Sequence, residues 1–514
     1  MSVSVELALD GRSLDLAAVG AVAARRAQVV LSEEARARVA RARALVERRA
    51  AGEDPVYGLN TGFGYLARGR IPSHELAQLQ LNLIRSHAVG VGEPLDAPST
   101  RVLMLLRANV IATGRAGVRV ATLELLLAML AKDLLPLIPG KGSVGASGDL
   151  APLAHLALAM VGEGEILVDG RPCPSGEVLR GAGLDVLVPD VKEGLGLING
   201  TQAMGAVGSL ALLEAERLAV LADVVGAVSL EADRGTPVAF DPRIHQARPH
   251  PGQLLSAENL RRLVDDSRVR DSHADCDRVQ DPYSFRCMPQ VHGATRDTLE
   301  FVRRTLSIEL NAATDNPLVF AEPGEEDAML SGGNFHGQPL ALALDFLAIA
   351  VSELGNISDR RVEQLIDPSL SQLPAFLVEN PGLHSGFMMA QVTAAALVNE
   401  NKVLAHPASV DSIPTSANRE DHVSMGMTSA RKAATVVANT QTCLVIELLC
   451  ACQALDFLKL PPGRGVAAAH RAVREVVPFM NEDRVLYRDV AALEGHIRDG
   501  HLIAAVEAEI GPLD

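Results

Sequence analysis

The sequence predicts a mainly α-helical protein of two parts, an N-terminal domain over residues 1–200 and a bundle of long helices over residues 201–514. Three observations carry this prediction. Apolar residues recur at helical spacing over long stretches of the second part. The connectors between those stretches are marked by glycine or proline. The chain of 514 residues, 48% hydrophobic and 21% charged, has the composition of a globular protein and is long enough for more than one unit.

The N-terminal part begins with a short strand and then becomes helical. Residues 3–9 alternate apolar and polar before an Asp-Gly turn, which is typical of a strand. Ser32 is placed to cap a helix whose first turn holds two glutamates. Residues 101–138 have helical spacing, and residues 165–172 predict a hairpin around a second Asp-Gly turn.

The second part is dominated by helical patterns. Residues 193–233 enter a run that is apolar on most faces, as expected of a helix buried inside a bundle. Four further patterns follow, over residues 294–312, 337–365, 421–458 and 465–477. No fixed-period repeat interrupts them.

Charge and composition exclude several classes of protein. The net charge of −16 argues against a nucleic-acid partner, which needs a basic surface. No uninterrupted apolar run approaches the roughly 18 residues of a membrane span. The first residues also lack the pattern of a signal peptide. We therefore expect a soluble, cytoplasmic protein with no membrane partner.

The cysteines and histidines indicate neither a disulfide framework nor a metal site. The cysteines are scattered, and none has a partner pair at zinc spacing: Cys173, Cys276, Cys287, Cys443, Cys450 and Cys452. A metal-dependent deaminase would need clustered ligands, but its zinc pattern is missing and the histidines lie far apart along the chain. We expect no metal.

The segment 142–149, Gly-Ser-Val-Gly-Ala-Ser-Gly-Asp, is the focus of the chemistry. It has three ordinary interpretations: a helix entry, an anion-binding nest or a flexible connector. A fourth is chemical, because in a sharply bent loop the amide nitrogen of Gly148 could attack the carbonyl carbon of Ala146. Closing that five-membered ring and dehydrating Ser147 would leave an exocyclic methylene, an electrophile made from the chain itself. Asp149 is placed to cap the helix that follows.

Two blocks of sequence resemble a known family. Residues 142–155, Gly-Ser-Val-Gly-Ala-Ser-Gly-Asp-Leu-Ala-Pro-Leu-Ala-His, resemble the signature of the aromatic amino acid ammonia-lyases, and residues 57–64, Tyr-Gly-Leu-Asn-Thr-Gly-Phe-Gly, match a second block. The resemblance extends over most of the chain. It implies that Ala146, Ser147 and Gly148 form the 4-methylideneimidazol-5-one group (MIO) autocatalytically, with no external cofactor. It also implies a helical fold with the electrophile in the N-terminal domain, and a homotetramer whose active sites combine residues from several subunits.

Elimination of ammonia needs a base for the β-hydrogen and a clamp for the substrate carboxylate. Arg286 suits the clamp because a guanidinium binds a carboxylate through two hydrogen bonds, although a structural ion pair is the commoner role of an arginine. The resemblance implies that Tyr57 is the base, which requires a pKa below the usual ~10 of a phenol. The ordinary alternative for Tyr57 is a packed residue in a mobile surface loop. Tyr283 would assist by hydrogen bonding.

Three further residues match blocks of the family. Asn199 and Gln280 would supply amide donors near the electrophile or the carboxylate, although an asparagine before glycine is by default a turn residue. Phe335 lies in Gly-Gly-Asn-Phe-His-Gly, residues 332–337.

The expected substrate depends on Ser86-His87 and on Glu420, which resemble the residues of the histidine-specific members of the family. A carboxylate at position 420 would accept an N–H hydrogen bond from imidazole, whereas beside a phenyl ring it would be desolvated without a partner, at a cost of about a few kcal/mol. The expected reaction is L-histidine to trans-urocanate and ammonia. His87 has the alternative role of a helix C-cap. Arg419 departs from the usual glutamine, and either pairs with Glu420 or points outward.

Two other functions stay open. A tyrosine or phenylalanine ammonia-lyase, or an aminomutase, would use the same electrophile with a different ring pocket. A catalytically silent helical scaffold would keep a similar core without forming the electrophile.

Overall fold

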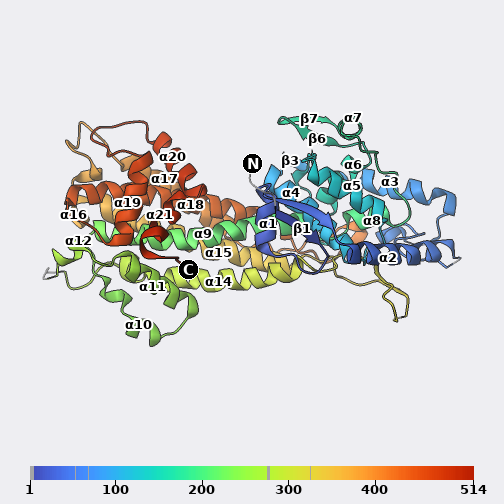
Figure 1. Ribbon diagram of the computed structural model, residues 1–514, viewed down its shortest axis with the longest axis horizontal. Coiled ribbons are helices and arrows are strands. Elements are labelled where there is room, and N and C mark those ends of the chain that lie inside the picture. Colours follow the sequence, from blue (N-terminus) through green and yellow to red (C-terminus); the bar gives the residue numbers. More distant parts are fainter. Residues whose placement is uncertain (1–4, 53, 68, 275–277, 325) are drawn as a thin grey trace. The chain divides into compact units, whose positions relative to one another are not determined.

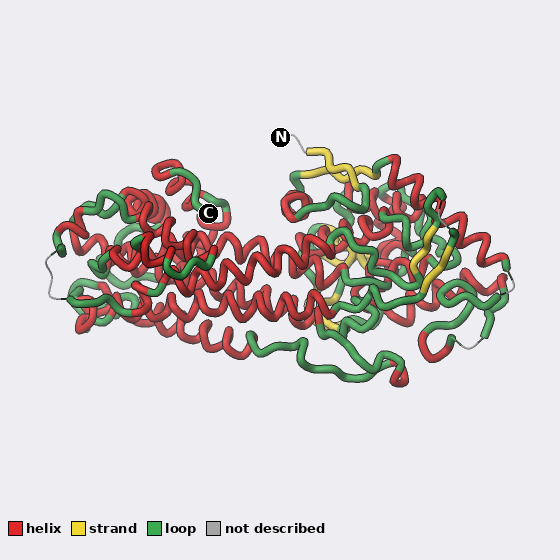
Figure 2. The backbone as a smooth tube through the Cα atoms, turned by 90° about the horizontal axis from the view of Figure 1, so that it is seen from below, coloured by secondary structure: helices red, strands yellow, loops and turns green. Residues whose placement is uncertain are grey.

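The computed structural model describes residues 5–52, 54–67, 69–274, 278–324 and 326–514. It is mainly α-helical, as predicted (Figures 1 and 2). The described cysteines are free thiols, and Cys276 lies outside the described residues.

The chain forms two compact units. Unit 1 comprises Met1–Leu213, Arg303–Asp345 and Pro407–Arg431, and unit 2 comprises Glu214–Val302, Phe346–His406 and Lys432–Asp514. Each unit therefore gathers segments that are distant in sequence. The four longest helices contribute residues to both units: α9 (Gln202–Ala232), α14 (Met288–Glu309), α15 (Gln338–Ile366) and α18 (Gly426–Leu458). The division at residue 200 stays a prediction about domains.

The strands of unit 1 are short. The predicted first strand is β1 (Val5–Leu9), which pairs in parallel with β2 (Ala27–Leu31), Val5 opposite Ala27. The predicted hairpin is also present: β6 (Glu165–Val168) and β7 (Arg171–Pro174) flank an Asp-Gly turn whose two residues both have positive φ. The remaining strands are β4 (Leu135–Pro136) beside β6, β3 (Val91–Pro94) with β5 (Pro139–Lys141), and β8 (Leu318–Phe320) with β9 (Ala328–Leu330).

The helices of unit 1 follow the apolar patterns of the sequence. Ser32 caps α2 (Glu33–Ala51) as predicted, accepting a hydrogen bond from the Ala35 amide at 3.2 Å. The predicted stretch 101–138 breaks into two helices near Gly114 and Gly117, which both have positive φ. The helices before α9 are α1 (Leu16–Ala23), α2 (Glu33–Ala51), α3 (Leu76–His87), α4 (Ala97–Ala112), α5 (Val120–Ala131), α6 (Leu150–Met160), α7 (Ser175–Gly181) and α8 (Glu193–Ile198).

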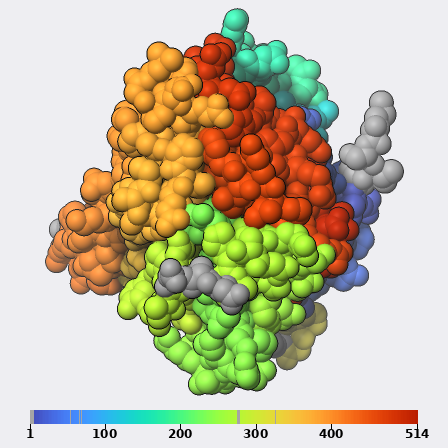
Figure 3. All heavy atoms as spheres, turned by 90° about the vertical axis from the view of Figure 1, so that its left-hand side faces the viewer, coloured from blue at the N-terminus to red at the C-terminus, as the bar shows by residue number. Residues whose placement is uncertain are grey.

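Unit 2 adds shorter helices to parts of the four long ones. In the face that Figure 3 shows, the yellow-green segment of α10–α12 (residues 242–271) adjoins the orange and red segments that follow it in sequence. The C-terminal helices α19 and α21 pack on each other. These helices are α10 (Pro242–Gln246), α11 (Pro251–Leu263), α12 (Arg268–Asp271), α13 (Tyr283–Arg286), α16 (Pro368–Ser371), α17 (Met388–Leu404), α19 (Arg464–Val476), α20 (Leu486–Arg498) and α21 (His501–Ile510).

Buried polar contacts connect the long helices inside unit 2. His292 of α14 lies 2.8 Å from Asp223 of α9, and both side chains are fully buried. The Arg361 guanidinium of α15 donates two hydrogen bonds to Glu447 of α18. Such partners are required because an unpaired buried charge is costly.

Two long helices, α15 and α18, would by length and composition alone be able to cross a membrane. In each, 72% of the most apolar window is buried inside the protein. Core helices of water-soluble proteins pass the same test, so this apolar character is explained by packing.

Candidate active site

The loop 143–149 is fixed by contacts on two sides. Gly148 bridges to Gly200, and the Asp149 amide donates to the Gly200 carbonyl at 2.7 Å. On the other side, the Ser424 hydroxyl donates to the Gly145 carbonyl at 2.9 Å. The loop is therefore a held turn rather than a flexible connector.

Glycine is required at two positions of this turn. Gly145 and Gly148 both have φ of +70°, which side chains disfavour. A Cβ atom at Gly148 would lie 2.0 Å from the Gly200 carbonyl oxygen, and one at Gly145 would lie 2.1 Å from Ser424 Oγ. A larger residue at Gly148 would require the backbone to move, and one at Gly145 would displace the Ser424 side chain.

Asp149 does not use its side chain to cap α6, contrary to the prediction. It occupies the N-cap position, but its carboxylate accepts hydrogen bonds from Ser143 Oγ and from the Met204 amide, each at 2.8 Å. Met204 lies in the first turn of α9, so Asp149 caps a different helix and joins it to the loop. Complete burial raises the pKa of Asp149 to about 6, against the opposing effect of these hydrogen bonds.

A cavity of about 550 Å³ in unit 1 lies beside this loop. Six of the predicted residues line it: Tyr57, His87, Ser147, Asn199, Phe335 and Glu420. Ala146 and Gly148, on either side of Ser147, are buried. None of the described residues lining the cavity is an arginine or a lysine, and Glu420 is the one carboxylate among them.

Glu420 contacts the loop directly. Its two carboxylate oxygens accept hydrogen bonds from Ser147 Oγ at 3.1 Å and from Thr415 Oγ1 at 2.6 Å. Arg419 is exposed, and the ion pairs of the described residues do not include one between Arg419 and Glu420. Of the two expectations for Arg419, the outward position is the one observed.

Tyr57 lies in an environment opposite to the one predicted for a base. Burial raises its pKa, and the negative charge of Glu420 raises it further, while a hydrogen bond from the Gly64 backbone lowers it. Within one chain the pKa of Tyr57 is therefore raised rather than lowered, and no cation lines the cavity among the described residues.

His87 is the last residue of α3 and lines the cavity, and its role toward the substrate stays a prediction. Its Nδ1 lies 2.9 Å from the Leu83 carbonyl oxygen, one turn back in the helix, a contact that requires a proton on Nδ1. Burial lowers the pKa of His87, despite the raising effects of the Leu83 carbonyl and of Glu420. A neutral ring with its proton on Nδ1 leaves Nε2 as an acceptor.

Asn199 is the C-cap residue of α8, and the hydrogen bonds of its side-chain amide differ from those predicted. Its Nδ2 donates to Asp315 Oδ1 at 3.1 Å and to the Asn316 carbonyl at 3.2 Å. Both N–H groups are thereby used, so Asn199 has no amide donor left for the site. Its main-chain carbonyl accepts from the buried Arg107 at 2.7 Å.

The polar residues around Asn199 were not recognised from the sequence. The missed residues are Arg107, Lys192, Asp315 and Asn316. The available signal was a charged side chain inside an otherwise apolar pattern, as at Arg107 in α4. Burial lowers the pKa of Arg107 to about 10 although the charge of Asp315 opposes this effect.

The remaining three predicted residues belong to unit 2 and do not line the cavity. Tyr283 and Arg286 lie in α13, with the guanidinium 4.3 Å from the centre of the Tyr283 ring. Tyr283 is 71% exposed, and Gln280 is also exposed. The structure therefore brings together Tyr283 and Arg286, but not with the lining of the cavity.

A family model described as aromatic amino acid lyase matches residues 14–475. The chain belongs to the aromatic amino acid lyase family. The histidine ammonia-lyase of Myxococcus xanthus is 56% identical over 501 residues, 97% of this chain and 98% of that one.

Two solved structures of the lyase family are similar over nearly the whole chain. The histidine ammonia-lyase of Trypanosoma cruzi has 46% identity and a TM-score of 0.91, covering 98% of this chain and 96% of that one. The tyrosine aminomutase of Streptomyces globisporus has 39% identity and a TM-score of 0.93, covering 99% and 100%. Within the described residues of this lyase, no group of three or more His, Cys, Asp or Glu side chains is placed to hold a metal ion.

Proposed function

We propose that this lyase deaminates L-histidine to trans-urocanate and ammonia. The observation that carries the proposal is Glu420, the one carboxylate of the described cavity lining, which faces Ser147 and has only hydroxyl partners among its described hydrogen bonds. An imidazole N–H can donate a hydrogen bond to this carboxylate, whereas a phenyl ring would leave the carboxylate desolvated and without a partner. The identity to relatives that are named histidine ammonia-lyases supports the same substrate.

We further propose that Ala146, Ser147 and Gly148 form MIO without an external cofactor. The fit is supported by the held turn and by Gly148, where a side chain has no room. When formed, MIO supplies an electrophilic methylene for the amine of the substrate. The Ser147 hydroxyl, which dehydration would remove, is within hydrogen-bond reach of Glu420.

The residues of the cavity suit binding of the ring and removal of a proton. Glu420 accepts an imidazole N–H, His87 offers Nε2 as a second acceptor, and Phe335 bounds the pocket. Tyr57 removes the β-proton, which requires a lower pKa than its burial gives, and hence a nearby cation in the assembled site.

We infer that a second copy of the chain supplies this cation. A substrate carboxylate needs a positive partner, and the described lining of the cavity has none. The segment that carries the exposed Gln280 and Tyr283 and the half-buried Arg286 offers a guanidinium and a phenol. A homotetramer with active sites shared between subunits would join these residues to the cavity. A cytoplasmic location stays a prediction from the sequence.

The test is an ultraviolet assay of the purified protein with L-histidine, L-tyrosine and L-phenylalanine, following the conjugated acrylate product. Urocanate alone is the expected result. Coumarate or cinnamate would overturn the assignment of the pocket while keeping the reaction class.

Two alternatives are separated by further readouts. An aminomutase, favoured by the similarity to the Streptomyces globisporus enzyme, would produce a β-amino acid, detected by chromatography of the reaction mixture. A silent scaffold would have the intact mass of the unmodified chain. The proposed enzyme is two water molecules lighter, and a Ser147→Ala variant loses that difference.

A further inference from the structure

A buried ion pair between Lys192 and Asp315 lies next to Asn199. Lys192 Nζ is 2.8 Å from Asp315 Oδ2, and the side chains are 0% and 1% exposed. A buried ion pair loses hydration on both sides, so its attraction alone is weak evidence for a stabilising role.

The backbone at Lys192 adds to the cost of placing a lysine here. Its φ of 70° and ψ of −16° lie in the left-handed region, which favours glycine. A strained backbone that carries a buried charge indicates a functional role for the side chain, and the contacts of the Lys192 side chain indicate which role this is.

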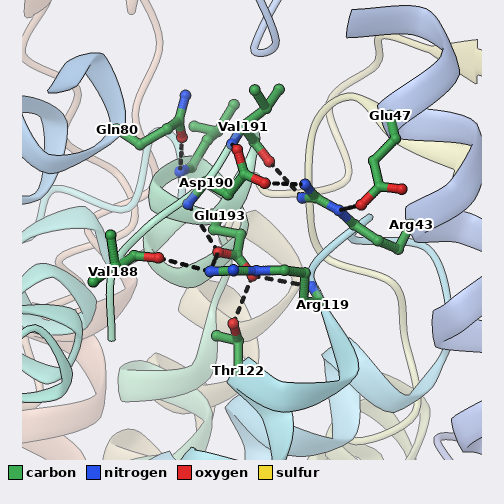
Figure 4. A network of polar contacts seen from close by, with 10 residues as sticks. Arg43, Glu47, Gln80, Arg119, Thr122, Val188, Asp190, Val191 and Glu193 are labelled. Atoms are coloured by element: carbon green, nitrogen blue, oxygen red, sulfur yellow. Dashed lines mark hydrogen bonds and ion pairs between the residues drawn. The ribbon is translucent and has the colours of Figure 1, made fainter. Parts of the chain in front are cut away.

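The turn on both sides of Lys192 is held rigidly (Figure 4). Glu193 accepts hydrogen bonds from the Arg119 amide at 3.0 Å and from Thr122 Oγ1 at 2.5 Å. On the other side, Arg43 donates to the Val191 carbonyl at 2.8 Å. The residues on both sides of Lys192 are therefore fixed, and the ammonium group binds Asp315 from this held turn.

Asp315 binds both Lys192 and Asn199, and so connects the held turn with the Asn199 side chain. While Oδ2 binds Lys192, Oδ1 accepts from Asn199 Nδ2 at 3.1 Å and from the Asn316 amide at 2.7 Å. If the Asn199 amide were turned over, its oxygen would face the Asp315 carboxylate and the Asn316 carbonyl, with no donor between them. This repulsion allows one orientation only.

In that orientation, Oδ1 is the one polar atom of the Asn199 side chain without a partner among the described residues. Asn199 is 3% exposed and lines the cavity, and its Oδ1 is buried with no hydrogen-bond partner among the described residues. A buried carbonyl oxygen without a donor is costly, and the amine of an amino acid supplies donors.

We propose that Asp315, held by Lys192, is a positioning residue that orients the Asn199 amide so that Oδ1 accepts a hydrogen bond from the substrate amine. This inference rests on the proposed function, since it takes an amino acid as the substrate. Asn199 then contacts the substrate as an acceptor, and Asp315 acts through it.

The test removes the carboxylate at position 315. Asp315→Asn lets the Asn199 amide turn over, so kcat/KM for L-histidine falls by roughly 10–100-fold. An unchanged kcat/KM would overturn the proposal, because the orientation of the Asn199 amide would then not depend on this carboxylate.

A second readout isolates the amine. In Asp315→Asn, the KM for L-histidine rises, but inhibition by imidazolepropanoate, which has no amine, is unchanged. Equal weakening of both ligands would contradict the proposal. Lys192→Arg, which keeps the cation, retains more activity than Lys192→Met.

The matched control is Glu447→Gln, which removes the carboxylate from the equally buried pair with Arg361 in unit 2. It lowers the melting temperature without changing the ratio of the two ligand affinities. Intact mass is recorded for every variant, so that a failure to form MIO is distinguished from a failure of positioning.

Failure of the proposed function is recognised separately. If the wild-type protein deaminates another amino acid, the same variants are compared on that substrate and its amine-free analogue. If it deaminates none, calorimetric affinities for L-histidine and imidazolepropanoate give the same comparison. A loss in Asp315→Asn that does not depend on the amine overturns the positioning role.

Discussion

At the scale of single residues, Glu420 connects the electrophile loop with substrate choice. Its carboxylate is held by Thr415 and reaches Ser147, and it raises the pKa of Tyr57. A charge in a half-closed cavity interacts strongly with its neighbours because little water screens it. One substitution at this position should therefore affect both ring binding and proton removal.

We predict that Glu420→Gln lowers kcat/KM for L-histidine by about 10–100-fold, the value of a hydrogen bond to a charged acceptor. Steady-state kinetics measure the effect. The matched control is Arg419→Gln, one residue away and exposed, which should leave the kinetics unchanged. A Glu420 variant with wild-type turnover of L-histidine would remove the basis for the substrate assignment.

At the scale of elements, the electrophile loop depends on the junction between α8 and α9. Gly148 contacts Gly200 at this junction, and Asp149 caps the first turn of α9. The loop conformation is therefore set by segments that are some fifty residues away in sequence.

We predict that Gly148→Ala blocks ring formation, because the added Cβ would lie 2.0 Å from the Gly200 carbonyl oxygen. Intact mass is the measurement, and the variant should keep the mass of the unmodified chain. Gly495→Ala in α20 is the control, since a Cβ there meets no atom within 4 Å and alanine favours a helix. Loss of two water molecules in Gly148→Ala would contradict the proposed chemistry of the loop.

The helix α9 also carries a carboxyl group with a shifted pKa. Burial raises the pKa of Glu231 from 4.5 to about 7, although hydrogen bonds such as that from the Gly463 amide, at 2.7 Å, act in the opposite direction. The native state holds the proton more tightly than the unfolded state, so wild-type stability falls as the pH rises from about 4.5 to 7.

We predict that the free energy of unfolding of Glu231→Gln rises relative to that of the wild type as the pH increases through this range, by about 3 kcal/mol at most. The reason is that glutamine does not ionise, so the variant does not lose stability when Glu231 of the wild type does. Thermal unfolding of both proteins between pH 4.5 and 8 measures the difference. A difference that stays constant with pH would mean that Glu231 does not titrate in this range.

The sequence carried the local elements but not the contacts between them. Helical spacing predicted α14, α15 and α18 because periodicity is a local property. The sequence places Asp149 directly before α6, whereas its carboxylate binds the Met204 amide of α9, 55 positions away in sequence. The pair of Lys192 with Asp315 joins positions 123 residues apart, so no local pattern reports it. The same reason applies to Asn199, whose donors are used by residues far along the chain.

At the scale of the whole molecule, the described lining of the candidate site contains no arginine or lysine. The cavity of unit 1 has the loop, a phenol and a carboxylate, while the guanidinium of Arg286 belongs to unit 2 and does not line it. A closed homo-oligomer repeats the same contact at every copy, so a segment that one copy supplies to the site of another is supplied in the same way at every site.

We predict that two inactive variants restore activity when they are assembled together. Ser147→Ala lacks the electrophile, and Arg286→Gln lacks the carboxylate clamp, so each alone should be nearly inactive. Coexpression with two different tags and purification on both yields mixed oligomers. If each site takes the loop from one copy and Arg286 from another, random assembly leaves roughly a quarter of the sites with both groups intact. If both groups of a site came from one chain, no site in the mixture would be intact, and activity would stay at the level of the single variants. Recovered urocanate formation in the mixed oligomers is therefore evidence that the active site is shared between copies.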